Sequence, residues 1–456
     1  MTPETAQPVT TEYFQTAMAA LDVQPPVAVA VSGGADSMAL LLLCRDWLRR
    51  SSDSGWADGL LALTVDHGLR RNSAAEAQRV AGWCADLGIA HRILQWADDK
   101  PTSSIQAAAR QKRYALLEAA CAERGIGDLL LAHQREDQAE TLLLNLMRGS
   151  GVHGLAAMQP LSKRGKLRFV RPLLDVPKSD LYATLRAAGQ DWIEDPSNHD
   201  SHYARVRMRT LYRHLRDEGM PPERLTATAA HMQRARAAID HYTDELLSKA
   251  AIVGDAGVAW LDPARLSAAP EEVGLRTIAR LITAIGAQRY TPRLSRLESL
   301  YQWLCAQPVT GGKTLSGCQL MPHKGRILIL REMASIGPDL RLAPGQSGRW
   351  DARFDVALGR ETASLCAGQA YFSVRAVGEV GLQQIRAMQT ARPAANLPVA
   401  ALRVMPGIWR GDALLAVPDL CYRHPAAAIL QRAVTLDFAP RHPVFCKPLN
   451  NGNDRA

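Results

Sequence analysis

The sequence lacks the features that define several classes of protein. Its 456 residues contain no run of about 18 apolar residues, the length that a membrane-spanning helix requires. Glu4 and Glu12 lie near its start, and no basic segment precedes an apolar stretch, so we expect no secretory signal. The eight cysteines include no CxxC pair, so we expect core thiols rather than a zinc site or a disulfide framework. Together these absences predict a cytoplasmic protein without a membrane anchor.

The charge is distributed unevenly along the chain. The formal net charge is +9, but residues 1–150 carry a net −4 while residues 151–456 carry +13. A basic surface attracts polyanions such as nucleic acids through phosphate contacts. An excess of this size also occurs in ordinary soluble proteins, so charge alone favours nucleic acid only slightly.

Short apolar runs alternate with longer amphipathic stretches over the first two hundred residues. This alternation predicts an α/β fold with a parallel sheet and helices on both of its faces. In such sheets ligands bind beyond the carboxyl ends of the strands. The expected strands are Val27–Val31, Leu60–Val65, Arg92–Trp96 and Asp128–Ala132, and the expected helices are Ser37–Arg50, Ser73–Leu87, Ser104–Arg124 and Glu136–Arg148.

The strand pattern stops near Asp180, and the rest of the chain has a different organisation. Long helical stretches follow, among them Pro222–Ala250 and Pro270–Ile285. After Gly311, Gly-rich turns separate short β-like runs. We therefore predict a catalytic domain over 1–215, a mainly helical domain over 216–333 and a small α+β domain over 334–456.

The hexapeptide SGGADS lies between the first predicted strand and its helix. Glycines allow the chain to turn tightly against an anion, and serine hydroxyls and helix N-terminal N–H groups can hold phosphate oxygens. Without the Gly-Lys-Ser/Thr ending it is not a Walker A loop. Asp36 beside a phosphate requires an intervening cation, which favours a Mg²⁺ ligand. The alternative is a plain Gly-rich turn with Asp36 near the helix cap. The phosphate-binding prediction covers Ser32, Gly33, Gly34, Ala35, Asp36 and Ser37.

Further polar residues follow the other strands. Asp66 and His67 end the second strand and are candidate nucleotide contacts; otherwise Asp66 caps the next loop and His67 is a packed polar residue. Arg110 and Arg113 are three residues apart on one helix, so they share a face on which they can neutralise a phosphate. The alternative for this pair is a solvated helix face, and Arg113 is the stronger candidate.

A histidine and two carboxylates follow the fourth strand. His133, Asp137 and Glu140 are spaced so that both carboxylates share one face of a helix beginning near Arg135. Such a group can bind Mg²⁺, orient an amine nucleophile or take up a proton. A structural histidine and acidic helix caps are the alternative.

The motifs together resemble those of the tRNA(Ile)-lysidine synthetases, a family of PP-loop ATPases. SGGADS resembles the SGGxDS pyrophosphate loop. Four further matches are in the family's order, and they span the chain to residue 209. These matches are VDHGLR at Val65–Arg70, ARQKRY at Ala109–Tyr114, HQREDQAET at His133–Thr141 with RGSG at Arg148–Gly151, and EDPSN at Glu194–Asn198 with Arg205 and Arg209 beyond it.

The chain also departs from the family pattern. Gln134 replaces a second histidine and cannot titrate, Glu136 replaces an aspartate, and Val206 replaces an asparagine. Glu136 keeps the charge with a longer reach, so a metal contact there stays open. Beyond Arg216 the resemblance weakens.

The resemblance implies a ligase with the PP-loop, adenine nucleotide alpha hydrolase-like fold. It would join L-lysine to the wobble cytidine of a tRNA(Ile) with a CAU anticodon, using ATP and Mg²⁺ and releasing AMP and pyrophosphate. Asp36 and Asp137 would hold the metal, with His133 or Asp137 as the base. Arg205 begins an arginine-rich segment, Tyr203–Arg216, that suits RNA contacts; a solvated basic helix is the alternative. The catalytic set is Asp36, Arg113, His133, Asp137, Glu140 and Arg205.

Two other functions fit parts of the sequence. One is a small-molecule, amide-forming PP-loop ligase, although the start Met1-Thr2-Pro3 offers no glutaminase nucleophile. The other is a non-catalytic tRNA-binding protein with a decayed ATP site, which the intact SGGADS argues against. The sequence leaves the oligomeric state and the lysine pocket open.

Overall fold

The computed structural model separates into two compact units, residues 1–236 and 237–456. It describes residues 6–51, 55–69, 72–97, 105–165, 167–194, 215, 218–306, 308–365, 370–388, 397–420, 422–427 and 429–445. Within these ranges no helix is both long and apolar enough to cross a membrane. The predicted division at residues 215 and 333 stays a prediction.

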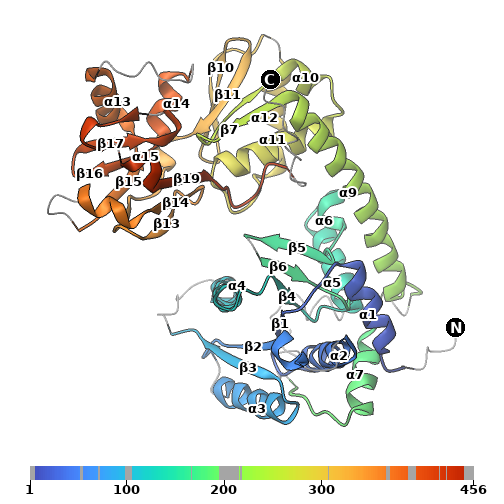
Figure 1. The fold of residues 1–456 in the computed structure, drawn as a ribbon. Helices are drawn as coiled ribbons and strands as arrows, with labels where there is room; N and C mark the ends of the chain where they lie inside the picture. The colour runs from blue at the N-terminus through green and yellow to red at the C-terminus, as the bar shows by residue number, and fades with distance from the viewer. Residues whose placement is uncertain are drawn as a thin grey trace. The chain divides into compact units, whose positions relative to one another are not determined.

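A six-stranded sheet forms the centre of the N-terminal unit (Figure 1). Its order is β3-β2-β1-β4-β6-β5, in which all neighbours are parallel except the β5–β6 pair. Short runs of Val, Leu and Ala form the inner strands because both faces of the sheet are covered. The strands are β1 (Val27–Ala30), β2 (Leu60–Asp66), β3 (Ala90–Gln95), β4 (Asp128–Leu130), β5 (Leu161–Arg164) and β6 (Leu167–Val170).

Helices cover both faces of this sheet, as predicted. On one face Phe14, Met38 and Leu185 from three helices join a buried core with Val27 and Val29 of β1. On the other face Leu117 of α4 packs in a second core with residues of β1, β2 and β6. The helices of the unit are α1 (Thr11–Ala20), α2 (Ala35–Ser51), η1 (Trp56–Gly59), α3 (Ser73–Asp86), α4 (Ile105–Glu123), α5 (Arg135–Met147), α6 (Val152–Leu155) and α7 (Lys178–Ala187).

The predicted helical middle of the chain is present, and it also carries a sheet. Its strands after Gly311 fall where short β-like runs were expected, whereas β7 and β8 were not predicted. This sheet is antiparallel with the order β7-β8-β11-β10-β9, and α11 packs against it in a common core. The elements are α9 (Pro222–Ala250), β7 (Ala251–Gly254), β8 (Val258–Leu261), α10 (Pro263–Ser267), α11 (Glu271–Ile285), α12 (Leu294–Cys305), β9 (Lys313–Leu315), β10 (Cys318–His323) and β11 (Arg326–Arg331).

The C-terminal part is α+β, as predicted. It contains two antiparallel sheets, ordered β12-β15-β16-β17-β18 and β13-β14-β19. Its elements are η3 (Met333–Ser335), β12 (Leu340–Leu342), β13 (Ser347–Trp350), β14 (Phe354–Leu358), η4 (Arg360–Leu365), β15 (Phe372–Ala376), α13 (Gly378–Ala387), α14 (Val399–Val404), β16 (Pro406–Arg410), β17 (Ala413–Val417), η5 (Pro418–Leu420), β18 (Tyr422–Arg423), η6 (Pro425–Ala427), α15 (Leu430–Ala433) and β19 (Val434–Phe438).

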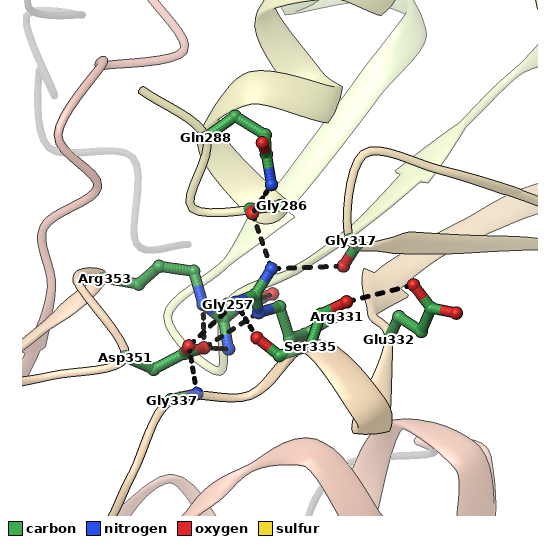
Figure 2. A network of polar contacts seen from close by, with 10 residues as sticks. All are labelled: Gly257, Gly286, Gln288, Gly317, Arg331, Glu332, Ser335, Gly337, Asp351 and Arg353. Atoms are coloured by element: carbon green, nitrogen blue, oxygen red, sulfur yellow. Dashed lines mark hydrogen bonds and ion pairs between the residues drawn. The ribbon is translucent and has the colours of Figure 1, made fainter. Parts of the chain in front are cut away.

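A buried ionic network joins these two parts of the second unit (Figure 2). Asp351, in the β13–β14 turn, accepts hydrogen bonds from Arg331 Nη2 at 3.0 Å and from Arg353 Nε at 2.8 Å. Arg331 also donates to the Gly286 carbonyl at 2.5 Å, and Arg353 to the Gly257 carbonyl at 3.2 Å. All three charged side chains are almost fully buried. One carboxylate therefore balances two buried guanidinium groups.

Asp419 makes the stability of the second unit depend on pH. Its carboxyl lies in η5, and Oδ2 is buried with no hydrogen-bond partner in the described part of the chain. Burial, and secondly the charge of Asp255, raise the pKa of Asp419 to about 6. The folded state binds this proton more tightly than the unfolded state, so protonation of Asp419 favours the folded state. This stabilisation is complete in acid and is lost as the pH rises through about 6.

We expect Asp419→Asn to raise the melting temperature at pH 8 and to change it little at pH 4. The amide removes a buried carboxylate that is charged only at the higher pH. Thermal unfolding of both proteins across this range measures the effect. Asp255→Asn is the control and should give a smaller gain at pH 8. An equal effect of Asp419→Asn at both pH values would contradict this origin.

Candidate active site

The SGGADS loop joins β1 to α2 at the carboxyl end of the sheet. Ser37 Oγ is buried, donates to the Gly34 carbonyl at 2.9 Å and accepts the Ser32 N–H at 3.2 Å. These bonds close the loop over the N-terminus of α2, where the helix dipole and backbone N–H groups favour an anion. Because α2 begins at Ala35, Asp36 lies in its first turn and is half-buried. The loop therefore has the form of a phosphate cradle.

Gly33 is required at its position in this loop. Its φ is +84°, and a Cβ there would lie 2.8 Å from both Ile193 Cδ1 and Val80 Cγ2. The Ile193 N–H donates to the Gly33 carbonyl at 2.8 Å. The contact brings the start of the Glu194–Asn198 motif beside the loop, although Asp195–Asn198 and the arginines from Arg205 to Arg216 lie outside the described residues.

Asp66 and His67 end β2, which is next to β1 in the sheet. Asp66 Oδ1 accepts the Gly68 N–H at 2.9 Å, so this carboxylate caps its own loop. The His67 ring packs edge-on against Trp96, with the ring centroids 6.2 Å apart. These are the structural roles weighed as alternatives above, and a nucleotide contact by either residue stays a prediction.

His133 lies between β4 and α5, and β4 is the other neighbour of β1. The helix begins at Arg135, as the spacing predicted. Gln134 is its N-cap: the Gln134 side chain accepts the Asp137 N–H at 3.3 Å, and Asp137 Oδ2 accepts the Gln134 N–H at 3.2 Å. This reciprocal pair is a capping box. Gln134 therefore has a structural role as an N-cap, and this role involves no proton transfer.

The two other acidic side chains of α5 differ in their surroundings. Glu136 accepts the Lys178 N–H at 3.0 Å, so it serves the N-terminus of α7, and burial is the main cause that raises the pKa of its carboxyl. Glu140 is 5% exposed, one turn beyond Asp137. The capping contact of Glu136 gives it a structural role, and metal binding by Asp137 stays a prediction.

Several arginines surround Tyr114 on α4. The guanidinium carbons of Arg110, Arg113 and Arg164 lie 5.3, 5.5 and 5.5 Å from its ring centroid. The ring also packs against Phe169 of β6. Arg113 is therefore held near the sheet by an aromatic contact, and its catalytic role stays a prediction.

The strand order places most of the predicted site residues at one edge. The order β2-β1-β4 puts Asp66, the SGGADS loop and His133 at the carboxyl ends of three adjacent strands. Mg²⁺ in phosphate-transfer sites is held by one or two carboxylates together with substrate phosphates. Asp36 and Asp137, in the first turns of α2 and α5, fit that donor set.

The sequence analysis gave no role to Arg171, the residue that directly follows β6. No signal pointed to it because the β5–β6 hairpin was not recognised: the run Leu161–Val170 contains three basic residues in its described part. Without the hairpin, nothing placed Arg171 at the ligand edge.

Comparisons with known proteins agree with this architecture. Residues 7–215 match the family of the PP-loop domain. Over 405 residues the chain is 36% identical to a tRNA(Ile)-lysidine synthase of Ruegeria pomeroyi, covering 88% of this chain and 90% of that protein. It is 37% identical to one of Wolbachia pipientis wMel, covering 73% and 77%. It is 42% identical to one of a Bradyrhizobium species, covering 61% and 79%.

Proposed function

The chain belongs to the tRNA(Ile)-lysidine synthase family, and from that premise we propose how its residues perform an ATP-dependent ligation. The substrates are ATP, L-lysine and tRNA(Ile), and the proposed target is the wobble cytidine of a CAU anticodon. The observation that carries the proposal is the closed Ser32–Ser37 loop at the N-terminus of α2, with Gly33 in the left-handed conformation. That loop would hold the ATP phosphates.

The reaction has two steps on one edge of the sheet. The cytosine carbonyl oxygen attacks the α-phosphorus, and pyrophosphate leaves with the electrons of the broken P–O bond. The lysine ε-amine then attacks the activated ring carbon, and AMP leaves. Asp36 and Asp137 would hold Mg²⁺, which would neutralise charge on the phosphates.

The amine must lose protons to act as a nucleophile, so the site needs a base. We assign this role to His133. An imidazole can accept a proton near neutral pH. Asp137 is a weaker candidate because its Oδ2 is held by the Gln134 N–H. Glu140, buried one turn beyond Asp137, would orient the cationic amine before the proton is removed.

The cytidine reaches the site without large cost because an anticodon loop is already single-stranded. We propose that Arg205 and the segment around it contact this loop, and that Arg113 neutralises phosphate charge. The positive charge of residues 151–456 favours the same partner.

AMP release measures this function directly. We expect release from ATP only when lysine and tRNA(Ile) are both present, with lysine becoming attached to the tRNA. Omission of each substrate in turn is the control. Release without tRNA would indicate a small-molecule ligase instead, and no release with all substrates would indicate a non-catalytic tRNA-binding protein.

A further inference from the structure

At the ligand edge of the sheet, Arg171 is a cation without a counter-charge among the residues that the structure describes. It follows the last residue of β6, and its Nη1 donates to the Gln159 carbonyl and to Ser162 Oγ, both at 3.0 Å. Its Nε is buried and has no hydrogen-bond partner among the described residues. None of the carboxylates described in the structure forms an ion pair with it. The group is therefore fixed in place by neutral acceptors.

Neighbouring arginines on the same hairpin are neutralised. Arg168, three residues earlier, pairs with Asp128 at 2.5 Å, and Arg164 pairs with Glu118 at 2.5 Å. The missing counter-charge at Arg171 is thus specific to that position. Charged groups that leave water normally gain an opposite charge, because desolvation otherwise disfavours them.

The surroundings of Arg171 add positive charge. Burial is the main cause that lowers the pKa of Arg171; the phenol of Tyr114 opposes the shift, and the positive charge of Arg110 adds to it. Arg110 lies on α4, is exposed, and contacts the Tyr114 ring. The positive charges of Arg110 and Arg171 therefore act against each other, and an anionic group of a ligand bound near them would offset that repulsion.

Arg171 lies in the sheet at a distance that a negatively charged group of one substrate can reach. Across the edge, the order β1-β4-β6 places the SGGADS loop, His133 and Arg171 in a row. Adjacent strands are about 4.8 Å apart, so Arg171 follows a strand about 10 Å from β1. In an extended lysine the carboxylate carbon is about 7 Å from the ε-nitrogen, given ordinary bond lengths. Lysine with its amine at His133 can thus reach Arg171.

We propose that Arg171, assisted by Arg110, binds the α-carboxylate of the substrate lysine and so selects an amino acid over a simple amine. This inference rests on the proposed function. A carboxylate fits better than a tRNA backbone phosphate, because Arg171 is half-buried and a small substrate approaches a half-buried group more readily than a tRNA backbone does. Its Nη1 is already engaged and its Nε is buried, so Nη2 is the group that would donate to the carboxylate.

The test compares lysine with pentane-1,5-diamine, which has the same amine and chain length but no carboxylate. In Arg171→Gln we expect kcat/KM for lysine to fall about 10- to 100-fold, the loss typical of a hydrogen-bonded charged group. The value for pentane-1,5-diamine should stay unchanged, as should the KM values for ATP and tRNA. Arg164→Gln is the matched control, because Arg164 contacts the same Tyr114 ring but is paired with Glu118.

A second measurement needs no variant. The wild-type enzyme should discriminate against lysinamide, which lacks only the negative charge, by a similar factor. Equal use of lysine and lysinamide would overturn the proposal, and so would an Arg171→Gln protein that raises the KM for tRNA while keeping its preference for lysine. If the wild-type enzyme shows no lysine-dependent AMP release, the proposed function itself has failed.

Discussion

Replacing Asp36 with asparagine is expected to reduce lysine-dependent AMP release at least about 100-fold, since altering even groups that only support a metal ligand costs 10- to 100-fold. Asp36 lies in the first turn of α2, directly beyond the glycines of the loop. There its charge would repel the ATP phosphates unless Mg²⁺ lay between them. The amide keeps the size of the side chain and removes the charge that holds the cation.

The affinity for tRNA should be nearly unchanged in Asp36→Asn, because the substitution affects only the ATP and metal site. A filter-binding measurement with tRNA alone checks this. Asp46→Asn is the matched control: Asp46 lies on the same helix, 41% exposed, and forms a surface pair with Arg45. It should retain full turnover. Retained turnover in Asp36→Asn would exclude the metal-ligand role.

The second large effect concerns stability. Asp351→Asn should lower the free energy of unfolding of the second unit by about 3–5 kcal/mol, the range for removing one partner of a buried ion pair. The substitution leaves Arg331 and Arg353 buried, at 6% and 1% exposure, without their shared carboxylate. Asparagine isolates the charge effect because it tolerates the left-handed backbone of residue 351, where φ is 48°.

Urea denaturation of the full chain measures this loss. The control is Asp355→Asn, which breaks the exposed Arg349–Asp355 pair on the strands of the same hairpin, 3.3 Å apart. Surface pairs contribute at most about 1 kcal/mol, so this variant should unfold nearly as the wild type does. If Asp351→Asn unfolds at the same urea concentration as Asp355→Asn, the network does not stabilise the unit.

The strand and helix pattern of the first unit could be read from the sequence. Buried β1, β2 and β4 are short apolar runs bounded by turns, and long amphipathic helices separate them. The prediction of α9 over Pro222–Ala250 was confirmed to the residue. Local patterns suffice to predict these elements, because the hydrophobic periodicity and the helix start and stop signals mark the same segments.

The missed strands have physical reasons. Leu161–Arg164 has a single apolar residue followed by a serine and two basic side chains, so it carries no apolar strand pattern; β5 is an edge strand, where charged side chains are common. β7 and β8 have four residues each, too few for a periodic signal. β8 pairs with β11, which is distant in the sequence, and β7 pairs with β8.

The candidate site likewise has some features that could be predicted from the sequence and others that could not. Motifs that are continuous in the chain, such as SGGADS before a helix, indicate their chemistry through local geometry, and the phosphate cradle could be predicted from them. The functions of Asp66, Gln134 and Glu136 as caps required the coordinates, because a carboxylate or an amide has the same spacing in the sequence whether it binds a ligand or a backbone N–H.

The sequence by itself determined the class of this protein: a PP-loop ligase with an N-terminal α/β sheet and its phosphate loop after β1. Only the tertiary structure decided which charges have partners. Arg164, Arg168 and Arg171 are alike in the sequence, but two of them meet a carboxylate from another element, and the third meets none in the described part of the chain. Ion pairing depends on residues that are far apart in the chain, so no local pattern reports it.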